Sequence, residues 1–304
     1  EIRPRDWSSD VCSSDLRRMI GWLSRRNPRR RARRLSNGIG HPSRGPGNLP
    51  FLSRSGTGQT AEIFADICAT VGVRVVNLVW RHLATIDGAL PWTWNAAKPL
   101  YLAGMPDQAA ARFRTSMIVP VLKELDGAQP PSVDAVLASY DHSNTVNLFG
   151  LGAIVAWLRG ETAAQGAPAT GPRLPAPDIA LPRLAGQDDV TPETWALVLR
   201  LNRFGDDRQI ILASMYRHLA HAPAFLERVE HALTPVAADG SLDRAIAGNR
   251  ARAREGAGLL ARAIVAQRPS RAAEIEASVS AFVDHAIGKM VTICRAIRIA
   301  RGSV

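Results

Sequence analysis

The sequence predicts an all-α protein, built as a pseudo-dimer of two similar helical repeats of about 140 residues. Apolar residues recur with the 3.6-residue period of helices, and alternating strand patterns with hairpin turns are absent. Two markers recur in the same order. Residues 80–90 (WRHLATIDGAL) match residues 216–226 (YRHLAHAPAFL), and residues 140–154 match residues 283–297 through an Asp-His pair. The offsets of 136 and 143 residues indicate a duplicated unit, with a pocket expected where the copies meet.

The N-terminal stretch, residues 1–54, is predicted to lie outside the fold. Residues 1–16 (EIRPRDWSSDVCSSDL) have no helical or strand period and match the translation of a common sequencing-library adapter, so we interpret them as an artefact. Residues 17–54 form an Arg-rich tail with eleven arginines and no acid. The net charge is +11 for the whole chain and −2 for residues 1–16, which leaves only +2 for residues 55–304. The basic surplus therefore belongs to the tail, and a nucleic-acid partner is not expected.

A linker separates the two repeats. Residues 160–189 are rich in Ala, Pro and Gly and break every helical period. The first repeat is residues 55–159, in which Ser132 is expected to open a long helix. The second repeat, residues 190–304, begins with Thr-Pro-Glu, which supplies an N-cap, a proline at the first helical position and an acid in the first turn.

Two asparagines interrupt the apolar stripe of the long helix. Asn144 and Asn147 lie within that stripe, and a buried amide without hydrogen bonds costs about 1–3 kcal/mol. The matching residues of the second repeat are Ile287 and Met290, so only one repeat carries buried amides. This asymmetry favours a single site between the repeats. Asn144 either serves that site or only ties its helix to a neighbouring element by hydrogen bonds, and both alternatives stay open. For Asn147 the structural tie is favoured.

Four histidines occur in pairs at matching places. His82 and His218 share one position on the core stripe of a short helix, and His142 and His285 follow the aspartates of the two Asp-His pairs. A histidine can act as a base near neutral pH. Because both repeats keep each histidine, a packing or capping role is favoured for all four.

Cysteine content and hydropathy exclude several classes of protein. With Cys12 assigned to the adapter, Cys68 and Cys294 remain, without CxxC or zinc spacing. A dithiol reaction and a structural metal site are therefore not expected. No run of 18 apolar residues and no secretory segment occurs, so a cytoplasmic protein without membrane contact is expected.

Residues 61–94, the helix that carries Asn144, the Pro-rich linker and the second RHLA segment together resemble the DehI-type 2-haloacid dehalogenases. The resemblance spans about residues 56–300 and implies an all-helical, AhpD-like pseudo-dimer. It also implies hydrolysis of the carbon–halogen bond of short 2-haloacids, with activity on both stereoisomers. In that reaction an aspartate deprotonates the attacking water, without metal or cofactor. The implied partner is a small carboxylic acid, and a homodimer is left open.

The resemblance transfers unevenly to this chain. The family's site asparagine falls on Asn144, whereas its catalytic aspartate falls on Met215, whose thioether cannot accept a proton at neutral pH. The candidate substitute base is His218, one turn further on, while Asp206 and Asp207 are expected to be surface capping residues. Two aromatic positions of the family's pocket fall on smaller side chains, and the expected pocket residues are Val75, Leu78, Tyr140, Ser214 and Tyr216.

Three functions therefore stay open. The first is haloacid hydrolysis, either with the family's chemistry or with a different base. The second is a catalytically silent or divergent protein that binds small molecules on the same scaffold. The third is the redox chemistry of AhpD-like proteins, which the lack of a cysteine pair opposes.

Overall fold

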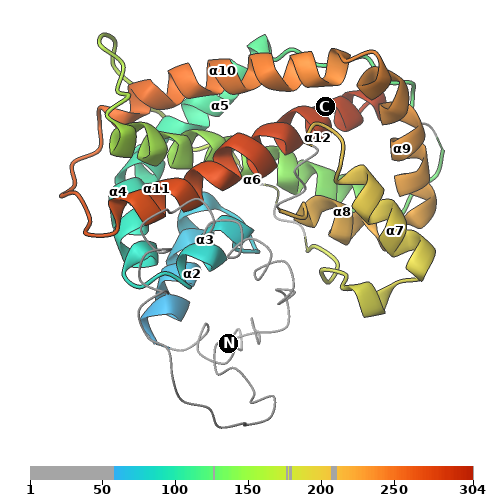
Figure 1. Cartoon of the computed structure of the whole chain (residues 1–304), viewed down its shortest axis with the longest axis horizontal. Coiled ribbons are helices and arrows are strands. Elements are labelled where there is room, and N and C mark those ends of the chain that lie inside the picture. Colours follow the sequence, from blue (N-terminus) through green and yellow to red (C-terminus); the bar gives the residue numbers. More distant parts are fainter. Residues whose placement is uncertain (1–57, 126, 176, 178–179, 207–210, 304) are drawn as a thin grey trace, which may run out of the picture.

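The computed structural model describes residues 58–125, 127–175, 177, 180–206 and 211–303, so the predicted tail lies outside it. Within these ranges the prediction of an all-α protein is confirmed, because every regular element is a helix (Figure 1). None of the described helices combines the length and apolar character needed to span a bilayer. The elements are α2 (Gln59–Val71), α3 (Leu78–Leu83), α4 (Ala89–Leu102), α5 (Met105–Ser116), α6 (Pro131–Arg159), η4 (Gln187–Asp189), α7 (Pro192–Leu201), α8 (Ser214–Leu219), α9 (Pro223–Ala238), α10 (Ser241–Ala261), α11 (Ala272–Ala281), the π-helical turn η5 (Phe282–Ile287) and α12 (Gly288–Ala300).

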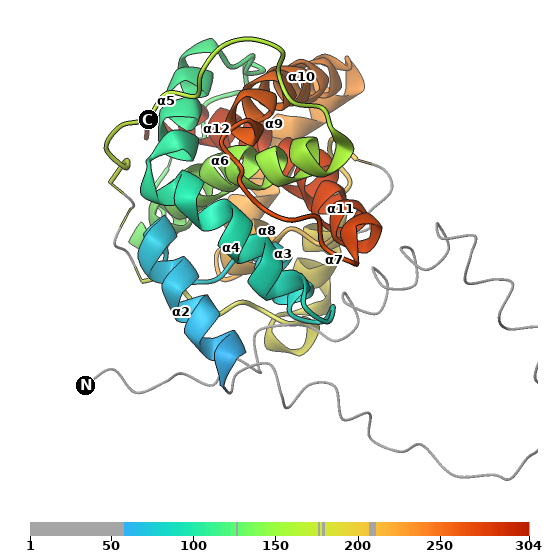
Figure 2. The same cartoon turned by 90° about the vertical axis from the view of Figure 1, so that its left-hand side faces the viewer.

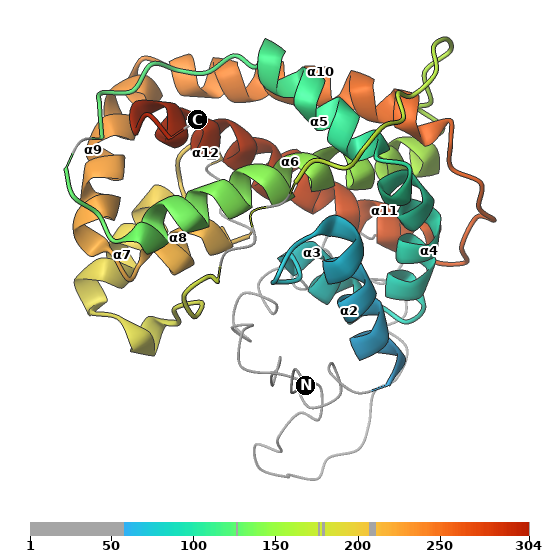
Figure 3. The same ribbon diagram turned by 180° about the vertical axis from the view of Figure 1, so that it is seen from behind.

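Helix α6 is the axis of the fold, and α10 and α12 lie along it (Figures 1 and 3). Every residue from Asp141 to Ala156 is buried, so this stretch is enclosed on all sides and not only along one stripe. Small residues allow this close packing. A methyl group on Gly152 would lie 2.9 Å from the side chain of Ala257 on α10. The helix begins at Pro131, one residue before the predicted Ser132.

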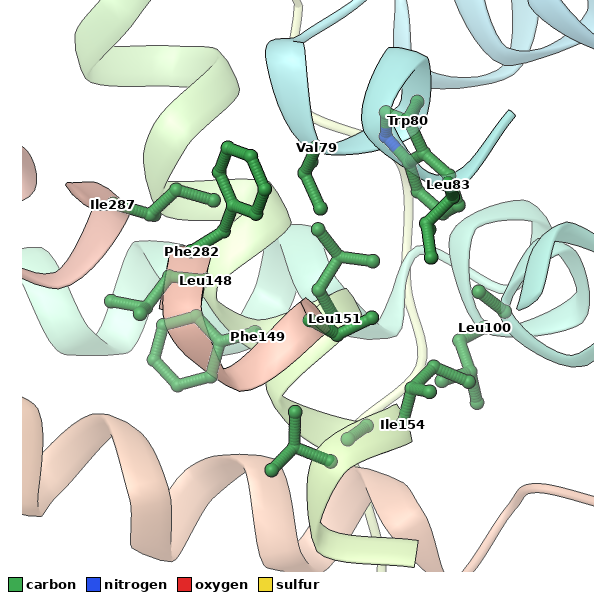
Figure 4. Close-up of a cluster of buried hydrophobic side chains, with 14 of the residues drawn as sticks. Val79, Trp80, Leu83, Leu100, Leu148, Phe149, Leu151, Ile154, Phe282 and Ile287 are labelled. Carbon is green, nitrogen blue, oxygen red and sulfur yellow. The ribbon is translucent and has the colours of Figure 1, made fainter. Parts of the chain in front are cut away.

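Two hydrophobic cores flank this axis. One core is formed by α2 to α5 with the C-terminal half of α6, α11 and η5. The other is formed by α7 to α9 with the N-terminal half of α6 and most of α12. In the first core, Val79 of α3, Leu151 of α6 and Phe282 of η5 point toward one another (Figure 4). Because the long helices contribute to both cores, each half of the chain buries apolar surface against the other.

Local signals explain where several helices begin and how they are joined. The predicted N-cap at Thr191 is confirmed, since its hydroxyl accepts a hydrogen bond from the backbone N–H of Thr194 at 3.2 Å. At the other end of the molecule α2 packs beside α4 (Figure 2). Asp66 joins these two helices, accepting hydrogen bonds from the Trp94 indole and the Lys98 ammonium, each at 2.7 Å.

The linker does more than connect the two halves. Gly171 donates its N–H to the carbonyl of Ala103, and Leu174 donates to the carboxylate of Asp107. These bonds hold the segment against the start of α5. The backbone of residues 180–185 then reaches the candidate site.

Candidate functional site

A cavity of about 460 Å³ lies between the two cores. This volume falls within the range of about 300–1,000 Å³ that is typical of sites for small molecules. Four parts of the fold meet there: the turn before α3, one face of α6, the end of the linker with the start of α8, and the junction of η5 with α12. The lining residues are Val73, Arg74, Val75, Val76, Asn77, Leu78, Val79, Arg81, Ser139, Tyr140, Ser143, Asn144, Leu181, Pro182, Arg183, Leu184, Ile211, Leu212, Ala213, Ser214, Met215, His218, Phe282, Ala286, Ile287 and Met290.

Most of the residues predicted from the sequence meet at this cavity. Ile287 and Met290, which stand where the first half has its two amides, also line it. Tyr216 does not. Its side chain is fully buried in the second core, next to the cavity wall in sequence but turned away from the lining. The predicted residues in the lining are Val75, Leu78, Tyr140, Asn144, Ser214, Met215 and His218.

Asn147 supports one wall without lining the cavity. Its amide oxygen accepts hydrogen bonds from the Trp80 indole at 3.2 Å and the Tyr101 hydroxyl at 3.0 Å. Its amide nitrogen donates to the side-chain oxygen of Asn77 at 3.2 Å and to the carbonyl of Ser143 at 2.8 Å. Asn77 precedes α3 and lines the cavity. Asn147 is therefore the tie between helices that the sequence favoured, and Asn144 alone of the two faces the cavity.

A second buried amide, Asn202, supports the opposite wall. It donates to the carbonyl of Ile211 at 3.1 Å and accepts from the N–H of Ala213 at 3.0 Å. The ammonium group of Lys289 donates a hydrogen bond to the main-chain carbonyl oxygen of Asn202 at 2.5 Å. The sequence analysis missed this support, although an asparagine that ends an apolar helical stripe is a usable signal for such a tie.

The end of the linker forms the third wall, and side chains of α8 hold it. Arg217 donates its Nε–H to the carbonyl of Ala185 at 2.7 Å, and His218 and Pro182 line the cavity together. His221 is bonded through Nε2 to the carbonyl of Arg183 at 2.7 Å. The sequence analysis treated this segment as a connector only, because its composition carries no sign of these contacts.

His218 lines the cavity as a neutral imidazole. Burial, followed in effect by the charges of Arg217 and Arg81, lowers its pKa to about 4. Nδ1 of this ring is buried and has no hydrogen-bond partner. A neutral imidazole keeps one lone pair, so its chemistry allows it to accept a proton.

His82, at the matching place in the first half, has different surroundings. Burial lowers its pKa to about 4 as well, but it lies outside the cavity lining and packs against the Phe282 ring with centroids 5.8 Å apart. Neither of its ring nitrogens has a partner. His82 therefore fits the packing role that the sequence favoured for both histidines, whereas His218 lies where a ligand would bind.

Next to His218, the cavity wall carries two hydroxyl groups. The Tyr140 ring lies 5.8 Å from the His218 ring, measured between centroids. Ser214 lines the cavity beside Tyr140, and burial raises the pKa of the Tyr140 hydroxyl. Tyr140 therefore stays protonated and serves as a neutral hydrogen-bonding group.

The charges of the lining favour an anion. Arg74, Arg81 and Arg183 line the cavity, and no aspartate or glutamate occurs among its described lining residues. Arg81 is half-buried and donates its Nε–H to the carbonyl of Val76 at 3.2 Å. Met215, where the resemblance expects an aspartate, is buried to 1% exposure and adds no charge. A carboxylate is therefore a suitable ligand group for this cavity.

The remaining acids named in the sequence analysis lie elsewhere. The expectation that Asp206 is a surface residue is wrong, because its side chain is only 9% exposed and its carboxylate lies 3.1 Å from Nδ1 of His285. Asp207 lies outside the described residues.

His142 is buried, with Nε2 3.4 Å from the carbonyl of Val71. Across the ranges described, no cluster of three or more His, Cys, Asp or Glu side chains could hold a metal ion.

Comparisons with known proteins support a likeness of fold. No protein-family model matches the sequence, and no curated protein matches it. Three solved structures are similar. The first is a D-2-haloacid dehalogenase mutant in complex with D-2-CPA, 19% identical over 80% of this chain and 93% of that one, with a TM-score of 0.64. The second is a D-2-haloacid dehalogenase mutant, 18% identical over 80% of this chain and 92% of that one, with a TM-score of 0.63. The third is a D-2-haloacid dehalogenase in complex with L-LA, 19% identical over 80% of this chain and 93% of that one, with a TM-score of 0.63. The chain therefore has a dehalogenase-like, all-helical fold.

Proposed function

We propose that the chain hydrolyses the carbon–halogen bond of 2-halogenated carboxylic acids by direct attack of water, with His218 as the base. The observation that carries this proposal is a neutral His218 in the lining of a cavity that also holds Asn144 and three arginines. The dehalogenase-like fold adds support. Water, base and substrate carboxylate would each find a group of suitable chemistry in one enclosure.

In the proposed step the imidazole of His218 takes a proton from water while the water oxygen attacks C2. The carbon–halogen bond breaks with its electron pair on the departing halide, and the products are a 2-hydroxy acid and an imidazolium that later releases its proton. A pKa of about 4 makes His218 about as basic as an ordinary aspartate, whose pKa is about 3.9. His218 can therefore stand in for the carboxylate that Met215 lacks, with the Asn144 amide available to orient the water.

A second function, binding without catalysis, is favoured by one observation. Met215 presents a buried thioether at the position where the resemblance expects the base. On this alternative the same cavity holds a small carboxylic acid and leaves it unchanged.

We also propose that the chain arose as two repeats, residues 55–159 and 190–304, joined by a linker at residues 160–189. In support, α3 and α8 are both six-residue helices with the same RHL ending. Trp80 and Tyr216, at matching places in them, are both fully buried. The site would then lie at the junction of two similar halves.

Halide release from D- and L-2-chloropropionate tests the function. We expect release by the wild-type protein and a loss of about 100-fold or more in His218→Gln, the usual effect of removing a general base. His82→Gln is the matched control, because His82 occupies the equivalent helix position outside the cavity, and it should retain the wild-type rate.

Met215→Asp separates the two functions. Release by this variant and not by the wild type would support binding without catalysis. Absence of release from both proteins would remove the dehalogenase proposal for this chain.

A further inference from the structure

The cavity is larger than a three-carbon haloacid requires. If each non-hydrogen atom of a ligand takes about the 30 Å³ of a liquid water molecule, a cavity of about 460 Å³ holds roughly 15 such atoms. A molecule such as 2-chloropropionate has only about six. Most of the space would then remain for something other than the reacting end of the acid.

Apart from Ser143, Asn144 and His218, the buried part of the lining is apolar. Val79, Met215 and Met290 line the cavity at 1%, 1% and 3% exposure, and Phe282 and Ile287 at 2% and 5%. These side chains offer no hydrogen bonds, so water there is poorly held and a hydrocarbon group would displace it favourably.

The charged lining residues are more accessible than these apolar ones. Arg74 and Arg183 are exposed and Arg81 is half-buried. Arg81 lines the same cavity as His218 and Tyr140. A carboxylate held by Arg81 would keep C2 near the base and leave the rest of a chain to run along the apolar lining.

We propose that the ligand of this cavity is a medium-chain carboxylic acid of about six to ten carbons, with its carboxylate at Arg81 and its hydrocarbon chain against the buried apolar wall. This inference rests on the proposed function only for the halogen at C2. The fit of the chain follows from the volume and the lining alone, so binding can be tested without catalysis.

The test is calorimetric titration of the full chain with propionate, butyrate, hexanoate and octanoate. Each methylene group transferred from water to an apolar wall should tighten binding about fourfold. Hexanoate, with three more methylene groups than propionate, should therefore bind roughly 60-fold more tightly, with one molecule per chain. Dissociation constants within threefold of one another across the series would overturn the proposal.

Ala286→Leu tests the location of the chain. Ala286 lines the cavity at 9% exposure, and a larger side chain would occupy the space of the hydrocarbon. The affinity of the protein for octanoate should fall at least tenfold in this variant, while its affinity for propionate stays the same. Ala277→Leu is the matched control on α11, outside the lining, and should leave the series unchanged. Should Ala286→Leu fail to fold, Leu78→Trp narrows the cavity at a half-exposed position.

The outcomes distinguish the two proposals. A steep dependence on chain length without halide release would uphold this inference and refute hydrolysis. Halide release from 2-chloropropionate with equal affinity for all four acids would do the reverse. An octanoate affinity that is the same in the wild type and in Ala286→Leu would refute the assignment of the chain to this cavity.

Discussion

Acid should destabilise this protein through two buried histidines. His82 and His218 are 1% and 4% exposed, and burial lowers the pKa of each from 6.5 to about 4. In the unfolded chain both would titrate near 6.5. Between these values the unfolded state binds more protons than the folded state, so the free energy of unfolding must fall as pH falls. The contribution is complete above pH 6.5 and is lost progressively toward pH 4.

The magnitude follows from the same values. At 1.36 kcal/mol per pH unit, the full difference between 6.5 and about 4 corresponds to about 3 kcal/mol for each histidine. At pH 5 the free energy of unfolding should be lower than at neutral pH by about 2 kcal/mol for each histidine, or about 4 kcal/mol for the pair. Lys289, whose pKa burial lowers to about 8, stays protonated in both states below pH 7 and adds nothing to this window. The expected loss is a large share of the 5–15 kcal/mol that stabilises a typical domain.

Urea denaturation followed by circular dichroism at pH 7, 6 and 5 measures this effect. The single variants His82→Phe and His218→Phe should each remove about 2 kcal/mol of the loss at pH 5. The double variant should keep only the part that His142 adds, because burial lowers the pKa of His142 as well. A wild-type loss below about 1 kcal/mol, or a double variant with the wild-type slope, would refute the reasoning that burial keeps both rings neutral.

Three substitutions test other parts of the fold by the same denaturation assay. Asn147→Leu leaves Trp80 and Tyr101 without their buried acceptor and should cost about 3–5 kcal/mol, whereas a cost below 1 would deny its role as a tie. Gly150→Ala should cost about 2 kcal/mol or more, because its methyl group would overlap the Tyr101 ring, and wild-type stability would show that the ring can move. Asp141→Asn should cost about 3 kcal/mol, because this 3%-exposed carboxylate pairs with arginines of α5 and α12, and an unchanged midpoint would contradict that estimate.

The fold class could be predicted from the sequence because it depends on local rules. The 3.6-residue period and the cap at Thr191 act over a few residues, and the structure agrees with both. Burial of Asn144 and Asn147 follows from the same period. Their different roles do not follow from the period. The two residues are three positions apart on α6, and Asn144 lines the cavity while Asn147 bonds Trp80 and Tyr101. What stands opposite a side chain is decided by helices distant in sequence.

Long-range contacts also explain the features that the sequence analysis missed. The composition of the linker predicts a tether, and its end joins the site because α8 supplies Arg217, which bonds the carbonyl of Ala185. The polar turn predicts a surface position for Asp206, whereas its carboxylate is buried beside His285. In each case the residue type was visible in the sequence and its partner was not.

The two histidines show why the site could be suspected and yet not assigned. His82 and His218 have the same neighbours in sequence and nearly the same pKa, so no local rule separates them. The difference lies in what meets each ring. Phe282 packs against His82, whereas Tyr140 and the end of the linker meet His218 at the cavity. Since the linker has no counterpart before α3 in the part of the chain described, only one of two similar positions gains a wall that can hold a ligand. Substitutions at His218 should therefore affect ligand binding, while those at His82 affect stability alone.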